Sequence, residues 1–155
     1  MEMPSDFREL LALFSAHPVE SLIVGGYALA FHGASRFTGD LDILVRPDAA
    51  NAHRILTALE AFGFASVGLT VSDFECPDQV VPLGVSPVRI DLITSITGVS
   101  WDEAWAGRTK DLAALEVLGT RKAKRTSCAE HIRRPCGATP PHKAGLNKPV
   151  GRVLR

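Results

Sequence analysis

Short apolar segments alternate with amphipathic segments along this chain, and this order limits the possible folds more than any other feature. Residues 21–24, 41–45 and 88–93 are apolar runs of strand length. Residues 5–16 and 49–62 instead repeat apolar side chains at three- and four-residue spacing, as amphipathic helices do, and residues 27–32 form a shorter helical segment. The alternation predicts an α/β (α+β) fold, a small mixed β-sheet flanked by helices.

The remaining segments give weaker signals. Residues 63–67 are expected to form a return strand, and residues 68–86 are expected to be irregular because Pro77 and Pro82 interrupt them. Ser100 and Glu103 have the spacing of a capping box, which predicts a short helix through Trp105. Residues 109–118 are expected to close the ordered domain as an amphipathic helix, so that residues 1–118 form one domain.

Charge is distributed unevenly, although the formal net charge is zero. Residues 1–118 contain 7 Lys or Arg against 16 Asp or Glu, whereas residues 119–155 contain 10 Lys or Arg and a single acid, Glu130. Four prolines and the loss of hydrophobic periodicity predict that residues 119–155 are a basic, largely unstructured tail. No run is long enough to cross a membrane and no signal peptide is visible, so a cytoplasmic location is expected.

Two acids lie at the start of the second apolar run, in the sequence Asp40-Leu-Asp42. Side chains alternate between the two faces of a strand, so Asp40 and Asp42 are expected to point the same way while Leu41 and Ile43 enter the core. Two carboxylates on one face repel each other unless water or a cation neutralises them. A hard divalent cation, typically Mg²⁺, is the natural partner for such oxygen ligands.

A third acid, Asp91, stands among apolar residues in the run from Val88 to Ile93. A lone carboxylate there is costly to bury without a partner charge. If this strand lies beside residues 41–45, the three acids converge and can hold two Mg²⁺ ions, as in sites that activate an attacking oxygen and stabilise a leaving pyrophosphate. The other readings are that Asp40 and Asp42 are solvated acids at a strand end, and that Asp91 forms a structural ion pair with Arg89.

Gly25 and Gly26 follow the first strand and precede a helix. A glycine turn of this kind lets backbone N–H groups approach a phosphate. Arg36, Thr38 and Lys110 are further candidates for phosphate contacts, although solvated surface positions explain them equally well or better.

These motifs together resemble the polymerase-β-like nucleotidyltransferase superfamily, which combines a glycine turn, an Asp-x-Asp strand and a third acid on a later strand. The segments 24–33, 36–42 and 89–95 look like its small bacterial branch, which includes the nucleotidyltransferase toxins of abortive-infection toxin–antitoxin systems. The similarity covers most of residues 7–118. It implies that Asp40 and Asp42 bind metal, that Asp91 completes the site and assists deprotonation of the acceptor, and that Gly25 and Gly26 flank the triphosphate.

The resemblance implies an enzyme that moves a nucleoside monophosphate from a nucleoside triphosphate to a hydroxyl of RNA or protein, with an antitoxin protein as a further partner. Family members usually insert a strand and a lysine-bearing helix before the segment that matches residues 107–112, and this chain does not. That departure favours the alternative, a catalytically degenerate protein of the same fold that acts by binding or has no activity. A third reading is an RNA-binding module that uses the basic tail.

Overall fold

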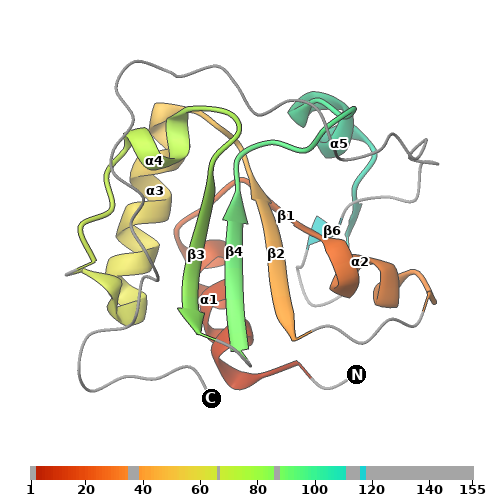
Figure 1. Ribbon diagram of the computed structural model, residues 1–155, viewed down its shortest axis with the longest axis horizontal. Coiled ribbons are helices and arrows are strands. Elements are labelled where there is room, and N and C mark those ends of the chain that lie inside the picture. Colours follow the sequence, from red (N-terminus) through yellow and green to blue (C-terminus); the bar gives the residue numbers. More distant parts are fainter. Residues whose placement is uncertain (1–2, 35–38, 66, 86–87, 111–115, 118–155) are drawn as a thin grey trace.

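The computed structural model describes residues 3–34, 39–65, 67–85, 88–110 and 116–117, and it has an α/β architecture (Figure 1). One mixed sheet contains six strands in the order β3-β4-β2-β1-β6-β5. Its strands are β1 (Ser21–Val24), β2 (Asp40–Val45), β3 (Val80–Val85), β4 (Val88–Ile93), β5 (Thr109–Lys110) and β6 (Glu116–Val117). The three strands predicted at residues 21–24, 41–45 and 88–93 are therefore confirmed.

Strand directions make the sheet mixed. Strand β2 runs parallel to β4 and antiparallel to β1, and β3 runs antiparallel to β4 at the edge of the sheet. The two-residue strands β5 and β6 pair with each other and extend the opposite edge through a parallel contact between β6 and β1. The chain therefore brings β2 and β4, which are more than forty residues apart, into direct contact at the centre of the sheet.

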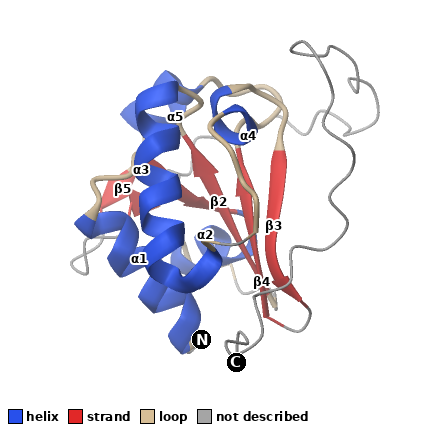
Figure 2. Ribbon diagram, turned by 90° about the vertical axis from the view of Figure 1, so that its left-hand side faces the viewer, coloured by secondary structure: helices blue, strands red, loops and turns tan. Residues whose placement is uncertain are grey.

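Helices pack mainly on one face of the sheet (Figure 2). They are α1 (Ser5–Ala16), α2 (Gly25–Phe31), α3 (Ala49–Leu59), α4 (Ser72–Glu75) and α5 (Trp101–Ala106), and a π-helical turn, η1 (Glu60–Phe64), extends α3. In Figure 1 α1 lies behind β3 and β4, α3 lies to the left of β3, and no described helix lies in front of β3, β4 and β2. One face of the central strands is thus covered by helices α1 and α3, whereas on the other face α5 packs only against the cluster that includes Leu44.

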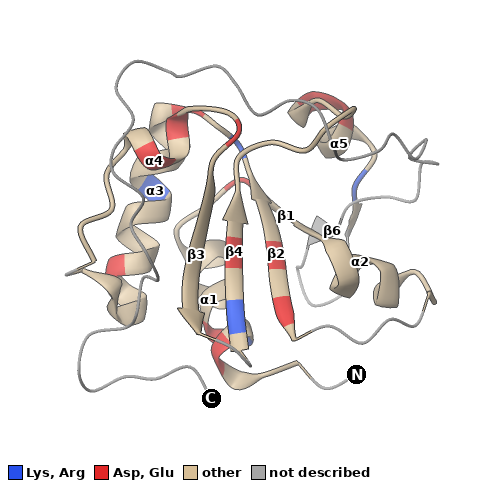
Figure 3. Cartoon of the chain, viewed as in Figure 1, with Lys and Arg blue, Asp and Glu red and all other residues tan. Residues whose placement is uncertain are grey.

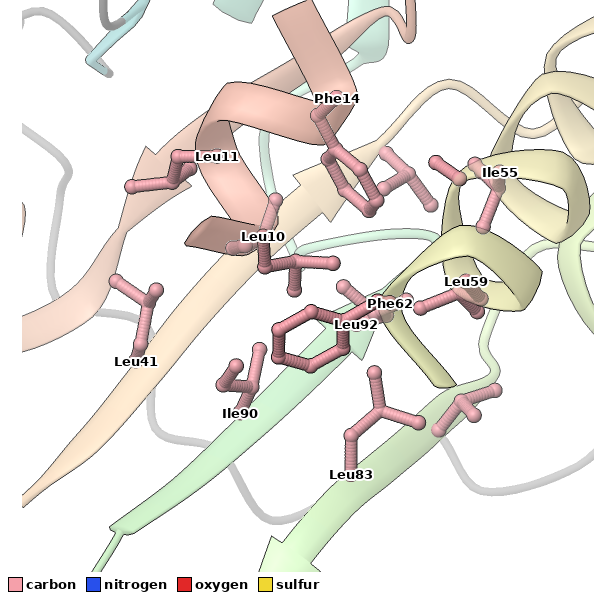
Figure 4. Close-up of a cluster of buried hydrophobic side chains, with 14 of the residues drawn as sticks. Leu10, Leu11, Phe14, Leu41, Ile55, Leu59, Phe62, Leu83, Ile90 and Leu92 are labelled. Atoms are coloured by element: carbon pink, nitrogen blue, oxygen red, sulfur yellow. The ribbon is translucent and has the colours of Figure 1, made fainter. Parts of the chain in front are cut away.

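The main core fills the space between α1, α3 and the covered face of the sheet (Figure 4). Leu41 and Ile43 of β2 and Ile90 and Leu92 of β4 are fully buried there, as their two-residue spacing predicts. Helix α1 contributes the apolar positions expected from its helical spacing, namely Phe7, Leu10, Leu11 and Phe14. This core fixes the strands whose opposite sides carry the acids.

A smaller apolar cluster lies on the other face of the sheet and contains Leu22, Val24, Leu44 and Ala104. Helix α5 covers it, and the predicted capping box that begins this helix is present between Ser100 and Glu103.

None of the helices in the described residues combines the length and apolar character that a bilayer crossing requires.

The buried side chain of Asn51 links the residue before β1 to the residue after β2. This link lies at the end of β2 opposite to Asp40. Asn51, fully buried in the first turn of α3, accepts hydrogen bonds from the Glu20 amide and from Arg54. Its amide donates to the carbonyl oxygens of Glu20 and Arg46. Asp48 caps the same helix by accepting from the Asn51 backbone N–H, which is the usual role of an aspartate at the residue before a helix.

Two local predictions are wrong. The return strand expected at residues 63–67 is not formed by the residues of this segment that the structure describes, because the chain continues into the π-helical turn η1, where Gly63 adopts a left-handed conformation with φ of 103°. The strand β3 forms instead within the segment expected to be irregular. Pro82 lies inside it, and the edge position explains this, since an edge strand tolerates a residue that lacks an N–H.

The helix expected at residues 109–118 is also wrong where the structure describes this segment. Residues 109–110 and 116–117 are the antiparallel strands β5 and β6, and pairing with β1 in the sheet outweighs the helical pattern. The basic tail predicted at residues 119–155 lies outside the described residues.

Candidate active site

Carboxylates from β2 and β4 lie on the open face of the sheet. Asp40 and Asp42 belong to β2, and strand alternation turns them away from the buried side chains Leu41 and Ile43. Figure 3 shows acidic positions on both neighbouring strands, together with a basic position on β4. The predicted sharing of one face by the two acids of β2 agrees with this arrangement.

The register between β2 and β4 brings the third acid level with the pair. Asp42 is the direct partner of Asp91, and Asp40 is the direct partner of Arg89. Neighbouring strands are about 4.8 Å apart, and directly paired residues point to the same face. The sequence identifies the three acids as candidates, but it is the parallel pairing of β2 with β4 that places them next to one another.

Arg89 binds two of the three acids through one nitrogen. Its Nη2 atom lies 3.0 Å from Oδ2 of Asp40 and 2.9 Å from Oδ2 of Asp91. The ion pair between Arg89 and Asp91 that the sequence left open is therefore present. The second ion pair, from Arg89 to Asp40, is not among the predictions from the sequence. The two-residue spacing of Arg89 and Asp91 places both side chains on one face of β4, and this was a sequence signal for such contacts.

Asp91 is the most enclosed of the three acids. Only 8% of the residue is exposed, and its Oδ1 atom has no hydrogen-bond partner among the described residues. Burial raises the pKa of Asp91, an effect that Arg89 opposes through its charge and hydrogen bond and that Asp40 reinforces. A buried carboxylate oxygen without a partner is costly, so this site favours a proton or a cation at Asp91.

Asp42 experiences a similar environment. Burial raises the pKa of Asp42 first, and the charges of Asp91 and Asp40 raise it further, while Arg89 lowers it. Both central carboxylates are thus held in a place where their charged forms are disfavoured. Structural acids are normally paired well enough to lower their pKa values, so this pattern is more typical of a functional site.

Gly25 packs its backbone directly against Asp42. It begins α2 with φ of +66°, a left-handed conformation that favours glycine. A Cβ atom at this position would overlap Oδ2 of Asp42 and lie 3.0 Å from its Cγ atom. The first residue of the glycine turn therefore shapes the space around a site carboxylate, a contact that the sequence did not reveal.

The remaining predicted site residues do not all join this group. Gly26 follows Gly25 in the first turn of α2. Lys110 belongs to β5, at the opposite edge of the sheet from β3 and separated from β2 by β1 and β6. Arg36 and Thr38 lie outside the described residues, so their predicted phosphate contacts remain predictions.

Two tryptophans border the smaller apolar cluster. The rings of Trp101 and Trp105 stack with centroids 5.2 Å apart, and the Arg108 guanidinium lies 3.9 Å from the centroid of the Trp105 ring. They pack against a cluster that includes Val24, the direct partner of Asp42 across β1 and β2. Helix α5 therefore closes the face beside the acids.

The donor atoms are chemically of the type that binds a hard divalent cation, but the described acids are not grouped as a three-ligand metal site. Carboxylate oxygens are the ligands that Mg²⁺ prefers, and the unpartnered Oδ1 of Asp91 is a free donor beside Asp42. In the part of the chain that the structure describes, no three His, Cys, Asp or Glu residues are grouped closely enough to hold one ion. Arg89 instead stands between Asp40 and Asp91.

Comparisons with protein-family models, with curated proteins and with solved structures find no match for this chain.

Proposed function

We propose that this protein is a metal-dependent nucleotidyltransferase that moves a nucleoside monophosphate from a nucleoside triphosphate to a hydroxyl of RNA or protein. The observation that carries the proposal is the pairing of Asp42 with Asp91 on the face of the sheet opposite the main core, two register positions from Asp40. The motif resemblance of residues 24–42 and 89–95 to polymerase-β-like nucleotidyltransferases supports the same chemistry.

In this reaction the acceptor oxygen forms a bond to the α-phosphorus, and the bond from that phosphorus to pyrophosphate breaks. Asp40, Asp42 and Asp91 would hold two Mg²⁺ ions, which neutralise charge on the triphosphate and on the leaving pyrophosphate. Asp91 is the candidate proton acceptor, because burial raises the pKa of Asp91 and a carboxylate with a raised pKa accepts a proton more readily. Gly25 and Gly26 would face the triphosphate.

Transfer of label tests this proposal. The purified protein is incubated with nucleoside triphosphates labelled at the α-phosphate, Mg²⁺, and either cell RNA or protein extract, and label is expected in a macromolecular product. Asp42→Ala should abolish the labelling, whereas Asp102→Asn, which removes an exposed acid of α5, should leave it unchanged. Equal labelling by wild type and Asp42→Ala would refute the assignment.

The resemblance also supports a role as the toxin of a toxin–antitoxin pair. Induced expression in bacteria should then arrest growth with the wild-type chain and not with Asp42→Ala. Arrest by both chains would separate toxicity from the carboxylate site, and absence of arrest by wild type would contradict the toxin role.

A second candidate is a catalytically degenerate protein of the same fold. It is favoured by the ion pairs of Arg89, which engage two of the three acids. Calorimetry with Mg²⁺ and nucleoside triphosphates discriminates between the two candidates. A degenerate protein shows no metal-dependent nucleotide binding, whereas the enzyme binds nucleotide in the presence of Mg²⁺ and loses this binding in the Asp42→Ala variant.

A further inference from the structure

We propose that the face of β2 and β4 that carries Asp40, Asp42 and Asp91, called here the carboxylate face, binds the basic run of this chain's own tail, residues 121–125, and is covered by it. The contact itself does not depend on the proposed function. Its consequence for activity does, because a bound run would compete with substrate for the same face.

The carboxylate face has more negative charge than its described cation neutralises. Arg89 places Nη2 3.0 Å from Asp40 and 2.9 Å from Asp91. Only 8% of Asp91 is exposed, and breaking this pair would leave a buried charge uncompensated, so Arg89 is a fixed part of the site. Asp42 is the register partner of Asp91, and no described side chain forms an ion pair with it. The face can therefore accept a further cation beside Asp42.

A cationic side chain fits this arrangement of acids. The described acids are not grouped as a three-ligand metal site, whereas an ammonium or guanidinium group can bind one or two carboxylates without a closed set of ligands. Arg89 demonstrates this, since one of its nitrogens binds acids of two strands. The Oδ1 atom of the buried Asp91 has no hydrogen-bond partner among the described residues and still needs a donor.

The charges of the body and the tail are complementary. Residues 1–118 contain 7 Lys or Arg against 16 Asp or Glu, and residues 119–155 contain 10 Lys or Arg against one acid. Four of those ten basic residues fall within residues 121–125, at the start of the tail. Because the run is covalently attached, its local concentration at the face is high, on the order of millimolar for a short connection.

The last described strand ends close to the acids. Strand β6 runs parallel to β1, and Val117 pairs with Ile23, the residue before Val24. Val24 is the register partner of Asp42, so the chain leaves β6 toward the end of the sheet that carries the acids. Two strand spacings, about 10 Å, separate β6 from β2. Residues 121–125 follow Val117 by four to eight positions, an extended reach of about 13–27 Å, which is sufficient to pass β1.

Carbodiimide cross-linking of the full chain tests the contact. The reagent activates a carboxylate, a lysine amine in contact with it forms an amide, and the carbodiimide leaves as a urea. The tryptic peptide 37–46 contains two acids, Asp40 and Asp42. In the monomer band this peptide is expected to be linked to Lys122 or Lys124 about fivefold more often than to the later lysines, Lys143 and Lys148, the ratio expected from two exposed ion pairs.

Salt and the oligomeric state of the product control this measurement. The preference should disappear at about 1 M NaCl, where the screening length is about 3 Å. Equal linkage of all four lysines at low salt would overturn the proposal. Linkage confined to the dimer band would also overturn it, because the tail of a second copy would then be the occupant.

Two variants of the full chain test the contact without cross-linking. Each removes four positive charges, the first from the run and the second from the rest of the tail. They are Arg121→Gln/Lys122→Gln/Lys124→Gln/Arg125→Gln and Arg133→Gln/Arg134→Gln/Lys143→Gln/Lys148→Gln. The first is expected to shift the backbone amide signals of Asp42 and Asp91 in a ¹⁵N–¹H spectrum, and the second to leave them as in wild type. Unshifted signals in the first variant, or equal shifts in both, would overturn the proposal.

The contact and the proposed function fail in different ways. If the carboxylate face is the reaction site, the variant without the run should transfer label about fivefold faster than wild type, and slower transfer would overturn the covering role. Absence of transfer by every chain, with the cross-link present, overturns the proposed function and leaves the contact standing. Transfer without the cross-link overturns the contact alone.

Discussion

Substitution of Gly25 by alanine should damage the carboxylate site more than the same substitution at a comparable glycine. Gly25 and Gly33 both have left-handed φ angles, of 66° and 84°, at the start and just after the end of α2. A Cβ atom at Gly33 would meet nothing within 4 Å, whereas one at Gly25 would overlap the carboxylate of Asp42. The pair therefore separates backbone strain from steric overlap.

The expected magnitudes follow from these two terms. A left-handed conformation costs a non-glycine residue about 1–2 kcal/mol, which is the whole expected loss for Gly33→Ala. Gly25→Ala adds the rotation of Asp42 away from its present rotamer, about 1 kcal/mol more, for a total of about 2–3 kcal/mol. The main core is not contacted, because the three nearest atoms are the Oδ2, Cγ and Cβ of Asp42, on the face of β2 opposite that core.

Urea denaturation of both variants measures the free energies of unfolding, and Mn²⁺ titration measures the site. We expect Gly25→Ala to weaken Mn²⁺ binding by displacing Asp42, and Gly33→Ala to bind as wild type does. The reasoning is refuted if the two variants lose equal stability and equal Mn²⁺ affinity, since the contact with Asp42 would then have no effect.

Three further outcomes are expected. Burial and neighbouring carboxylates raise the pKa of Asp42, so its charge destabilises the metal-free fold, and Asp42→Asn should raise the melting temperature at pH 7. Because the folded state holds this proton more tightly than the unfolded state, the gain should shrink as the pH falls through the raised pKa; a gain that grows on acidification has the wrong sign. Asn51→Ala should cost about 2–4 kcal/mol in urea denaturation, since it removes three part-buried hydrogen bonds to the backbone of Glu20 and Arg46, and a loss under 1 kcal/mol would contradict that role. Removing the capping box with Ser100→Ala should cost about 1 kcal/mol by the same measurement, and an unchanged stability would show that the cap is dispensable.

The sequence predicts the central part of the fold well. The strands at residues 21–24, 41–45 and 88–93 and the helix caps at Asp48 and Ser100 follow from local rules of periodicity and capping, and the structure contains them. The errors at β3 and at β5 and β6 have a different cause. Those segments are strands because they pair with neighbouring strands of the sheet. The local sequence pattern of residues 80–85 and 109–117 does not specify these pairing partners.

The candidate site divides in the same way. Period-two alternation is enough to predict that Asp40 and Asp42 share a face. The neighbouring position of Asp91 depends on the order and register of β2 and β4, which the sequence suggested only through the motif. The ion pair from Arg89 to Asp40 and the contact of Gly25 with Asp42 join residues from separate strands or turns, so only the three-dimensional structure reveals them.

The two-sided character of β2 has a consequence for how this protein tolerates change. Alternate positions along its six residues have different roles, since Leu41 and Ile43 belong to the buried core while Asp40 and Asp42 lie on the opposite face. A chain that had lost its activity through mutation of these acids would still fold, and the apolar positions between them would still show its relationship to active proteins of the same fold. Activity and architecture can therefore be inherited, or lost, independently within a single strand.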